Sequence, residues 1–522
     1  MINQTDLGER IHQVAQMSAI YGTASQVIVW LGDSWPGAEV TLEFLQRLGE
    51  DETLHLEPSL DPSITVNGLK LDSKELCEHL IRIFDLPWWK RTWTIQDFVL
   101  AKDLVFQCSS GSISRDLMYM ARENFWGHKD RCCPVGEWDT DPALPMSLGR
   151  AFEVPARLDF ITKSRGHTYS VLTAAATFCK RGMSDPRDRI YGMLGLGTGE
   201  YASLVQPDYS LSPEQVCEAV AIESVERTGT LEFLSHLFEH KNTKLPSFLP
   251  NWTGKFDWND IYSLRLGNVR YFSTSTAIRA KVKLVAPGIL ATQGAIFDTI
   301  TATSPGADLF NYLLQPDSLV ELLSLAGLET PSEDPYCHTT DSRLVAFWHT
   351  LCGGMEMTLR DSNRFAGRLK GSTDLSKWSK LATFLTAQPH FRAEQWDNEL
   401  GHIFPDIETA TRGRKFFVTK RGCFGLAPRK CEIGDFVVVL VGGNVPYIIH
   451  SASSSSPCPS LSPLSSSPSS SSSASHEPCE SGDQDSRRYT ILGDSYVHGI
   501  MDGELFDLLD ETERRLEEIM LV

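Results

Sequence analysis

The hydrophobic positions near the start of the chain predict a helix that leads into a buried strand. Apolar side chains recur at helical spacing over residues 7–21, after a capping residue at Thr5 or Asp6. The run QVIVWLG, residues 26–32, is continuously apolar and β-branched, which is typical of a strand inside a parallel sheet. A helix leading into such a strand is the second half of a βαβ unit. The pattern therefore predicts an α/β fold with a partial open parallel sheet, whose first strand would have to end by Asn3.

The pattern then changes twice along the chain. Helical periodicity dominates up to about residue 410, with local cues such as Ser212 as a helix cap. The most explicit cue is SDPRDRIYGMLGLG, in which Asp185 is expected to cap a helix, with Pro186 and Asp188 at its first and third positions. From Gly413 the apolar runs have the length and flanking glycines of strands.

This division predicts four segments. The predicted segments are a partial N-terminal domain (1–114), a mainly helical region (115–410), a small β unit (411–503) and a C-terminal helix (504–522). The β unit is interrupted by residues 451–487, whose serine and proline content cannot bury a core. We expect that loop to be disordered.

Composition and charge narrow the classes of function. The formal net charge of −19 disfavours binding to nucleic acid, which requires clustered lysine and arginine. No apolar run is long enough to span a membrane. Twelve cysteines without a C-x-x-C pair are typical of reduced thiols, so a cytoplasmic location is expected. His128, Cys132 and Cys133 lie close together, but adjacent cysteines are awkward for one tetrahedral metal, and no metal site is expected.

Several motifs, taken in order, resemble the fungal heterokaryon incompatibility (HET) domain family. INQTDLGERIHQVAQMSAIYGTASQVIVWLGD is similar to the family's Ile-Asn-Gln, Glu-Arg, Gln-Val and Val-x-x-Trp-Leu-Gly core. PWWKRTWTIQDFVLAKDLVFQCSS resembles its Trp-x-x-Arg-x-Trp-x-x-Gln-Glu element, with Asp97 where Glu is usual. SDPRDRIYGMLGL, PDYSLSPEQV and LPSFLPNW resemble the region behind that domain, and GRKFFVTKRGCFGLAP, GDFVVVLVGG and YVHGIMDGE resemble the C-terminal end. The set covers nearly the whole chain.

The resemblance implies a cytoplasmic trigger of cell death, acting when genetically unlike fungal cells fuse. It also implies a relationship to TIR domains, some of which cleave NAD with a glutamate while others assemble partners. Family members usually carry a Ser-Tyr-x-Trp-Gly element and two strands upstream of Ile-Asn-Gln, so an N-terminally shortened chain is expected. With that sheet incomplete, we expect no NAD hydrolysis and no cofactor.

Each candidate site residue has a structural alternative. Asn3 and Gln4 follow a presumed strand end, where ligands bind, but capping is the simpler role. Glu9 and Arg10 are candidates for catalysis and binding, against a surface role. Asp33 faces either a pocket or its own Asx turn.

The motif residues are expected to be structural. Trp30 and the tryptophans near Trp89 are expected in the core, and Arg91 is a candidate buried ion pair with Asp97. His498 and Asp502 form either an acid–base pair or part of a strand that runs into a glycine turn. The full set is Trp30, Gly32, Trp89, Arg91, Trp93, Gln96, Asp97, Asp185, Pro186, Arg187, Asp188, Tyr191, His498, Gly499, Asp502 and Gly503.

Three hypotheses remain open from the sequence. The first is a HET-family signalling protein that acts in non-self recognition through self-association or partner binding. The second is a TIR-like NAD-cleaving enzyme, with Glu9 as its weak candidate acid. The third is an inactive remnant.

Overall fold

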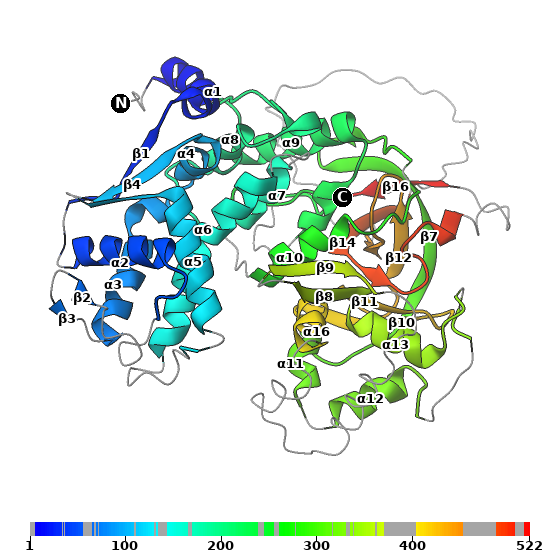
Figure 1. The fold of residues 1–522 in the computed structure, drawn as a ribbon. Helices are drawn as coiled ribbons and strands as arrows, with labels where there is room; N and C mark the ends of the chain where they lie inside the picture. Colours follow the sequence, from blue (N-terminus) through cyan, green and yellow to red (C-terminus); the bar gives the residue numbers. More distant parts are fainter. Residues whose placement is uncertain are drawn as a thin grey trace, which may run out of the picture.

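The computed structural model shows an N-terminal helical lobe and a strand-rich C-terminal lobe (Figure 1). It describes all residues except 1–5, 34, 36, 56–64, 67–68, 71–72, 109–110, 130–131, 134–142, 165–169, 238–244, 255–259, 277, 316, 330–334, 338, 361–362, 370–402, 453–486 and 507–515. None of the described helices is both long enough and apolar enough to cross a membrane.

The predicted N-terminal sheet exists, but it is mixed. Strand β1 (Val27–Trp30) pairs in parallel with β4 (Leu104–Cys108), and Val29 lies opposite Phe106. Strand β5 (Gly111–Ser114) is antiparallel to β4. Only two residues separate β4 from β5, and such a short connection reverses the chain direction. The α/β class is confirmed, whereas the all-parallel sheet is not.

Among the described residues, strand β1 lies at the edge of its sheet, with one buried and one exposed face. Val27 and Val29 are buried, while Ile28 and Trp30 keep 59% and 52% of their surface exposed. The buried face continues to Phe106, whose ring stacks on Trp89 at a centroid distance of 5.1 Å. The expectation of Trp30 in the core is therefore wrong, because strand alternation directs it away from the only face that is covered.

The helices of the N-terminal lobe cross the boundary predicted at residue 114. Helix α2 packs on α5, and α3 packs on α6. The lobe is therefore larger than residues 1–114. Its helices are α1 (Leu7–Thr23), α2 (Ala38–Glu50), α3 (Ser73–Asp85), α4 (Thr94–Leu100), α5 (Arg115–Lys129) and α6 (Ala143–Ser164), and it also contains the short strands β2 (Thr65–Val66) and β3 (Leu69–Lys70) and the 3-10 helix η1 (Pro87–Lys90).

The capping residues predicted from the sequence are confirmed for one of the helices that connect the lobes. Helix α9 (Pro213–Thr228) has the expected capping box, in which Ser212 and Gln215 hydrogen-bond reciprocally, and it ends at Gly229 in the left-handed region. Helix α8 (Asp188–Leu194) begins two residues later than predicted. The connecting segment also contains α7 (Val171–Thr177), η3 (Gly199–Tyr201) and η4 (Glu232–His236).

The C-terminal lobe is built on one long strand, β7 (Ile289–Thr303). Strand β7 pairs antiparallel with both β12 (Phe436–Leu440) and β16 (Glu517–Leu521). Because β12 pairs with β13 (Tyr447–Ser451), β13 with β14 (Arg488–Asp494), and β14 with β16, these five strands close into a ring. The ring and its extension form a nine-stranded sheet, completed by β6 (Lys283–Ala286), β10 (Arg414–Thr419), β11 (Phe424–Pro428) and β15 (Tyr496–Val497).

Two predicted boundaries differ from this arrangement. Strands β6 and β7 lie in the region predicted to be mainly helical, so the sheet begins well before residue 411. The predicted helix over 504–522 begins as expected at Glu504 but is wrong at its end, where residues 517–521 form β16. Hydrogen bonding to β7 overrides the helical pattern there.

Helices and a hairpin surround the ring of strands. The described helices of this lobe are α10 (Asp260–Val269), α11 (Leu309–Leu313), α12 (Ser318–Leu325), α13 (Arg343–Leu351) and α16 (Ile403–Thr411), and the hairpin is β8 (Met355–Arg360) with β9 (Asn363–Arg368). The turn predicted at Gly442 and Gly443 connects β12 to β13, as expected. The expected disorder of residues 451–487 falls almost entirely outside the described residues.

The strands that flank this loop are direct neighbours. His450 lies opposite Thr490, and the Ala452 amide donates a hydrogen bond to the Arg488 carbonyl at 2.9 Å. Replacing residues 453–486 with a short Gly-Ser linker should therefore leave the melting temperature almost unchanged, which a thermal scan can measure. The control Ile449→Asp, which buries a charge in the same hairpin, should lower it strongly. A large destabilisation by the deletion would contradict the prediction.

Candidate functional site: a charged junction on the first helix

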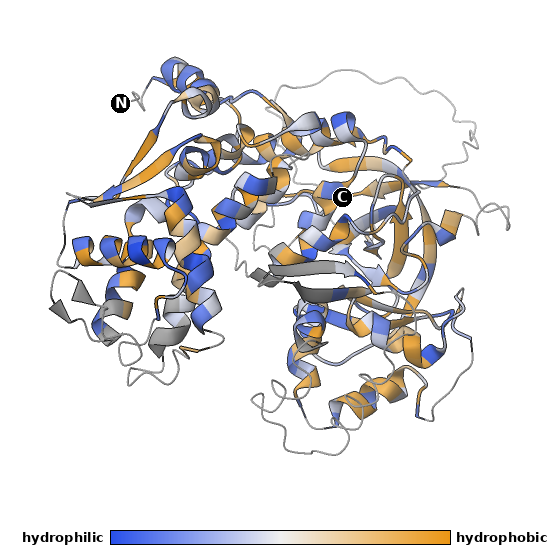
Figure 2. Cartoon of the chain, viewed as in Figure 1, coloured by the Kyte–Doolittle hydropathy of each residue, from blue (hydrophilic) through white to orange (hydrophobic). Residues whose placement is uncertain are grey.

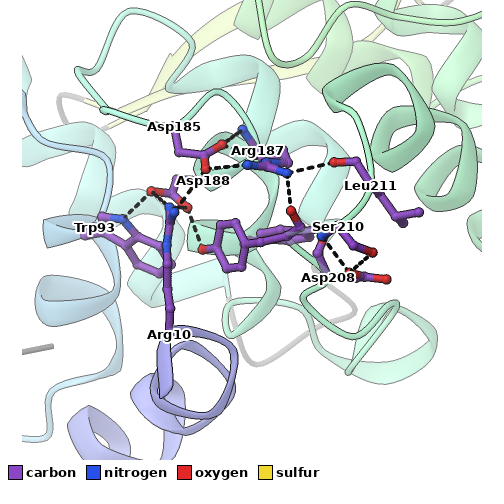
Figure 3. A network of polar contacts seen from close by, with 10 residues as sticks. Arg10, Trp93, Asp185, Arg187, Asp188, Asp208, Ser210 and Leu211 are labelled. Atoms are coloured by element: carbon purple, nitrogen blue, oxygen red, sulfur yellow. Dashed lines mark hydrogen bonds and ion pairs between the residues drawn. The ribbon is translucent and has the colours of Figure 1, made fainter. Parts of the chain in front are cut away.

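The carboxylate of Asp188, at the start of α8, collects hydrogen bonds from three distant segments (Figure 3). Arg10 on α1 donates from Nη2 to both oxygens, at 3.0 and 3.1 Å. The Tyr209 hydroxyl donates at 2.6 Å, and the Trp93 indole nitrogen at 3.2 Å. This one side chain therefore ties the first helix to α8 and to the segment before α9.

A second carboxylate, that of Asp185, continues the network. Arg10 reaches it through Nη1 at 3.1 Å, and Arg187 binds it with two parallel hydrogen bonds of 2.9 and 2.8 Å. The remaining Nη1 donors of Arg187 go to the carbonyls of Tyr209 and Leu211. The Arg10 guanidinium also lies 3.7 Å from the centroid of the Tyr209 ring, a cation–π contact.

This junction accounts for the late start of α8. Asp188 was expected at the third position of the helix, reaching back to the cap Asp185, but its carboxylate binds Arg10 and Tyr209 instead. The residues before it form a turn, in which the Arg187 amide donates to Asp185 Oδ1 at 3.0 Å. Pro186 lies inside that turn. Local capping is thus replaced by a tertiary contact.

Burial and charge oppose each other within the junction. Burial raises the pKa of Asp188, and the hydrogen bond from Tyr209 and the charge of Arg10 offset that rise only in part. Burial acts in the same direction on Asp185, but the hydrogen bonds and charge of Arg187 hold its pKa below the ordinary value. Two carboxylates face two guanidiniums, and these groups bind one another. Such an arrangement fixes geometry rather than moving protons.

Two further motif residues bind near the junction, one between α4 and α8 and the other between α8 and the segment before α9. The side-chain amide of Gln96 donates to the Gly192 carbonyl at 2.8 Å in a fully buried position. The Tyr191 hydroxyl donates to the Asp208 carbonyl at 2.7 Å. Motif residues far apart in the sequence therefore meet in one place.

A second polar cluster lies in the C-terminal lobe. His498 is bound through Nε2 to Asp341 Oδ2 at 2.9 Å and through Nδ1 to the Tyr496 hydroxyl at 3.0 Å. Burial, with the nearby His349, lowers the pKa of His498 to about 4. Asp502 pairs instead with Arg368, so the alternative of a His498–Asp502 acid–base pair is wrong.

Comparison with known proteins gives a match in each lobe. A family model described as "Heterokaryon incompatibility protein (HET)" matches residues 1–97, and one described as "Het-6 beta-barrel domain" matches residues 334–456. "Heterokaryon incompatibility protein 6, OR allele" of Neurospora crassa is 25% identical in an alignment that covers 98% of this chain and 81% of that protein. The chain is thus similar to heterokaryon incompatibility proteins, in two separate segments and along most of its length. No solved structure matches it.

The other HET-motif residues at the N-terminus take separate places. Asn3 and Gln4 lie outside the described residues. Glu9 lies in the first turn of α1, where its amide donates to the cap Asp6 at 3.0 Å. Asp33 is exposed and follows Gly32, which has a left-handed backbone.

Arg10 corrects the expectation of a surface or catalytic role. Its side chain is only 12% exposed, and its contacts in the junction are structural. Sequence reasoning also passed over Tyr209, Asp341 and Arg368. A tyrosine set in an Asx turn, with Ser210 donating to Asp208, was the one available signal for Tyr209.

In the stretch PWWKRTW, residues 87–93, the tryptophans pack in or against the core as predicted, whereas the arginine does not form the expected pair. Trp89 is buried, and its indole nitrogen donates to the Ile83 carbonyl at 2.9 Å. Trp93 binds Asp188, as described above. The Arg91 side chain is exposed, so the expected buried ion pair with Asp97 is wrong.

Asp97, at the end of the matched HET segment, is a buried acid with a raised pKa. Its Oδ1 atom is buried without a hydrogen-bond partner among the described residues. Burial raises its pKa to about 6, although hydrogen bonds from Tyr21 and Trp88 and the charge of Arg91 act in the opposite direction. At neutral pH the folded protein therefore holds a charge that its surroundings disfavour.

Replacing Arg10 with methionine should leave the Asp188 carboxylate without its main cation. We expect a loss of about 3 kcal/mol in the free energy of unfolding, measured by denaturant titration. The control Lys90→Met removes an exposed pair with Asp85 and should change stability by less than about 1 kcal/mol. Equal effects of the two substitutions would rule out a central role for the junction.

Replacing Asp97 with asparagine should stabilise the protein above pH 6. The unfolded carboxyl titrates near 3.8 and the folded one near 6, so the cost of its charge is absent below 3.8 and complete above 6. That difference corresponds to about 3 kcal/mol at most. Melting temperatures from pH 4 to 8 should show a gain over wild type that grows with pH. Asp116→Asn, at an exposed position, should show no such trend.

Proposed function

We propose that this protein triggers cell death in fungal non-self recognition, in the cytoplasm, by associating with copies of itself or other proteins through its HET segment. The matches to the HET and Het-6 barrel models support the setting. The relative from Neurospora crassa bears the name of a heterokaryon incompatibility protein. The edge of β1 supports association as the mode of action.

The edge of β1 is the observation that carries the proposal. In the described part of the chain, β1 has β4 on one side and no strand on the other. Its open face presents Ile28 and Trp30, and Figure 2 shows the strand as largely hydrophobic. An edge strand exposes unpaired backbone N–H and C=O groups, which another strand can bind.

The helix before β1 adds to this apolar surface. Leu7 and Ile20 on α1 are each 50% exposed. The four charged groups of the junction, Arg10, Asp185, Arg187 and Asp188, are bound to one another, so they offer little to a substrate. Apolar area and free backbone groups are the means by which strands recruit partners.

Inducible expression in fungal cells, with viability as the readout, tests the function. The double variant Ile28→Lys and Trp30→Lys should abolish killing while leaving protein abundance unchanged. Glu9→Gln should kill like wild type. If Glu9→Gln alone abolishes killing and prevents a loss of cellular NAD, a TIR-like enzyme replaces the proposal. Survival of cells that express the wild-type protein at full abundance would instead indicate an inactive remnant.

The same face gives a biophysical prediction. Ile28→Lys with Trp30→Lys should keep the wild-type melting temperature and reduce self-association, measured by light scattering after size exclusion. The matched control Val29→Lys, one position away on the buried face, should cost several kilocalories per mole of stability. A wild-type protein that stays monomeric at tens of micromolar would contradict self-association through β1.

A further inference from the structure

Two histidines and two cysteines lie close together where the loop after α2 meets the C-terminal end of α5, and none of them belongs to the charged junction. His128 is in the last turn of α5, and Cys132 and Cys133 follow that helix. His55 comes from the loop after α2. Their four ligand atoms lie within 4.8 Å of one another. We propose that His55, His128, Cys132 and Cys133 form a structural zinc site.

The separations between the donor atoms fit one tetrahedral ion. Zinc bonds of about 2.3 Å to sulfur and 2.0–2.1 Å to nitrogen place tetrahedral ligands roughly 3.3–3.8 Å apart. The two sulfurs are 3.8 Å apart, and His55 Nδ1 lies 3.5 Å from Cys132 Sγ and 3.4 Å from Cys133 Sγ. His128 Nδ1 lies slightly closer, at 3.1 Å from Cys132 Sγ. One nitrogen nearly equidistant from two sulfurs fits a shared ion better than a single hydrogen bond.

A hydrogen bond outside the cluster fixes the orientation of His128. Its Nε2 lies 2.7 Å from the carbonyl oxygen of Glu52, which can only accept, so Nε2 carries the proton. The Nδ1 lone pair is thereby directed toward the sulfurs. Metal-binding histidines characteristically donate their other N–H to a carbonyl or carboxylate in this way.

The backbone conformation allows the two adjacent cysteines to bind the same ion. The amides of Cys132 and Cys133 both donate to the His128 carbonyl, at 3.0 and 2.9 Å. This turn at the end of α5 directs both sulfurs to the same side. Two thiolates and two neutral imidazoles favour zinc, and four protein ligands leave no open position for a substrate. The ion would tie the loop after α2 to the end of α5.

Metal content and cobalt spectroscopy test this site. The full-length protein, purified without chelator, should contain one zinc per chain by mass spectrometry. After chelation, added Co²⁺ should give the visible absorption of tetrahedral cobalt with sulfur-to-metal charge transfer, and two protons should be released as the thiols ionise. Zinc removal should lower the melting temperature.

Variants distinguish this site from adventitious binding. Cys132→Ser, at an exposed position, and His128→Asn should each abolish stoichiometric zinc and the cobalt spectrum, while Cys337→Ser should retain both. The titration of folded wild-type protein is decisive even if a variant fails to fold. Absence of zinc and of tetrahedral cobalt in that protein, or a disulfide between Cys132 and Cys133 shown by intact mass, would overturn the proposal.

Discussion

The Asp188 carboxylate is the contact on which the N-terminal half of this protein depends. It receives hydrogen bonds from Arg10, Trp93 and Tyr209, which belong to three separate segments. A buried carboxylate in such a place is stable only while its cation is present, because an unpaired charge there is strongly disfavoured. The position of α1, and through it the direction of β1, thus follows from a residue 178 positions away from Arg10 in the sequence.

In the C-terminal lobe, the main constraint is that the strands must close into a ring. Strand β7 contacts both ends of a path that runs through β12, β13, β14 and β16. The closed ring brings β7 and β12 very close at Gly294. A Cβ atom there would lie 2.8 Å from the Val439 carbonyl oxygen, which is too short for a normal contact. The matched Het-6 segment, residues 334–456, omits β7, β14 and β16. The ring therefore needs strands on both sides of the matched segment.

Features that depend on neighbouring residues were predictable from the sequence, and features set by distant contacts were not. The capping box of Ser212 and Gln215 lies within four residues, and its prediction is confirmed. Asp185 and Asp188 have the spacing of a similar capping motif in the sequence, but the Asp188 carboxylate binds Arg10 instead. The end of the chain carries a helical pattern, yet its hydrogen bonds to β7 make residues 517–521 a strand.

The same distinction between local and distant contacts applies to the candidate site. The motif residues were identified from the sequence as structural, but their meeting point was not, because no pattern links Arg10 to Tyr209. His55 was not singled out at all, since 77 residues separate it from Cys132. Adjacent cysteines in a sequence argue against a shared metal, and only the turn after α5, in which both amides donate to the His128 carbonyl, brings their sulfurs together.

The matched HET segment is not a self-contained structural unit in this chain. Residues 1–97 contain Arg10, whose two carboxylate partners lie at Asp185 and Asp188, and β1, whose only described strand partner is β4. The segment also ends before α5, on which α2 packs. Residues downstream of position 97 thus provide the partners of Arg10, of α2 and of one edge of β1. No described residue pairs with the other, outer edge of β1. Because the downstream chain already occupies the inner face, the outer edge of β1 is where, in the described part of the chain, the proposed association would have to take place.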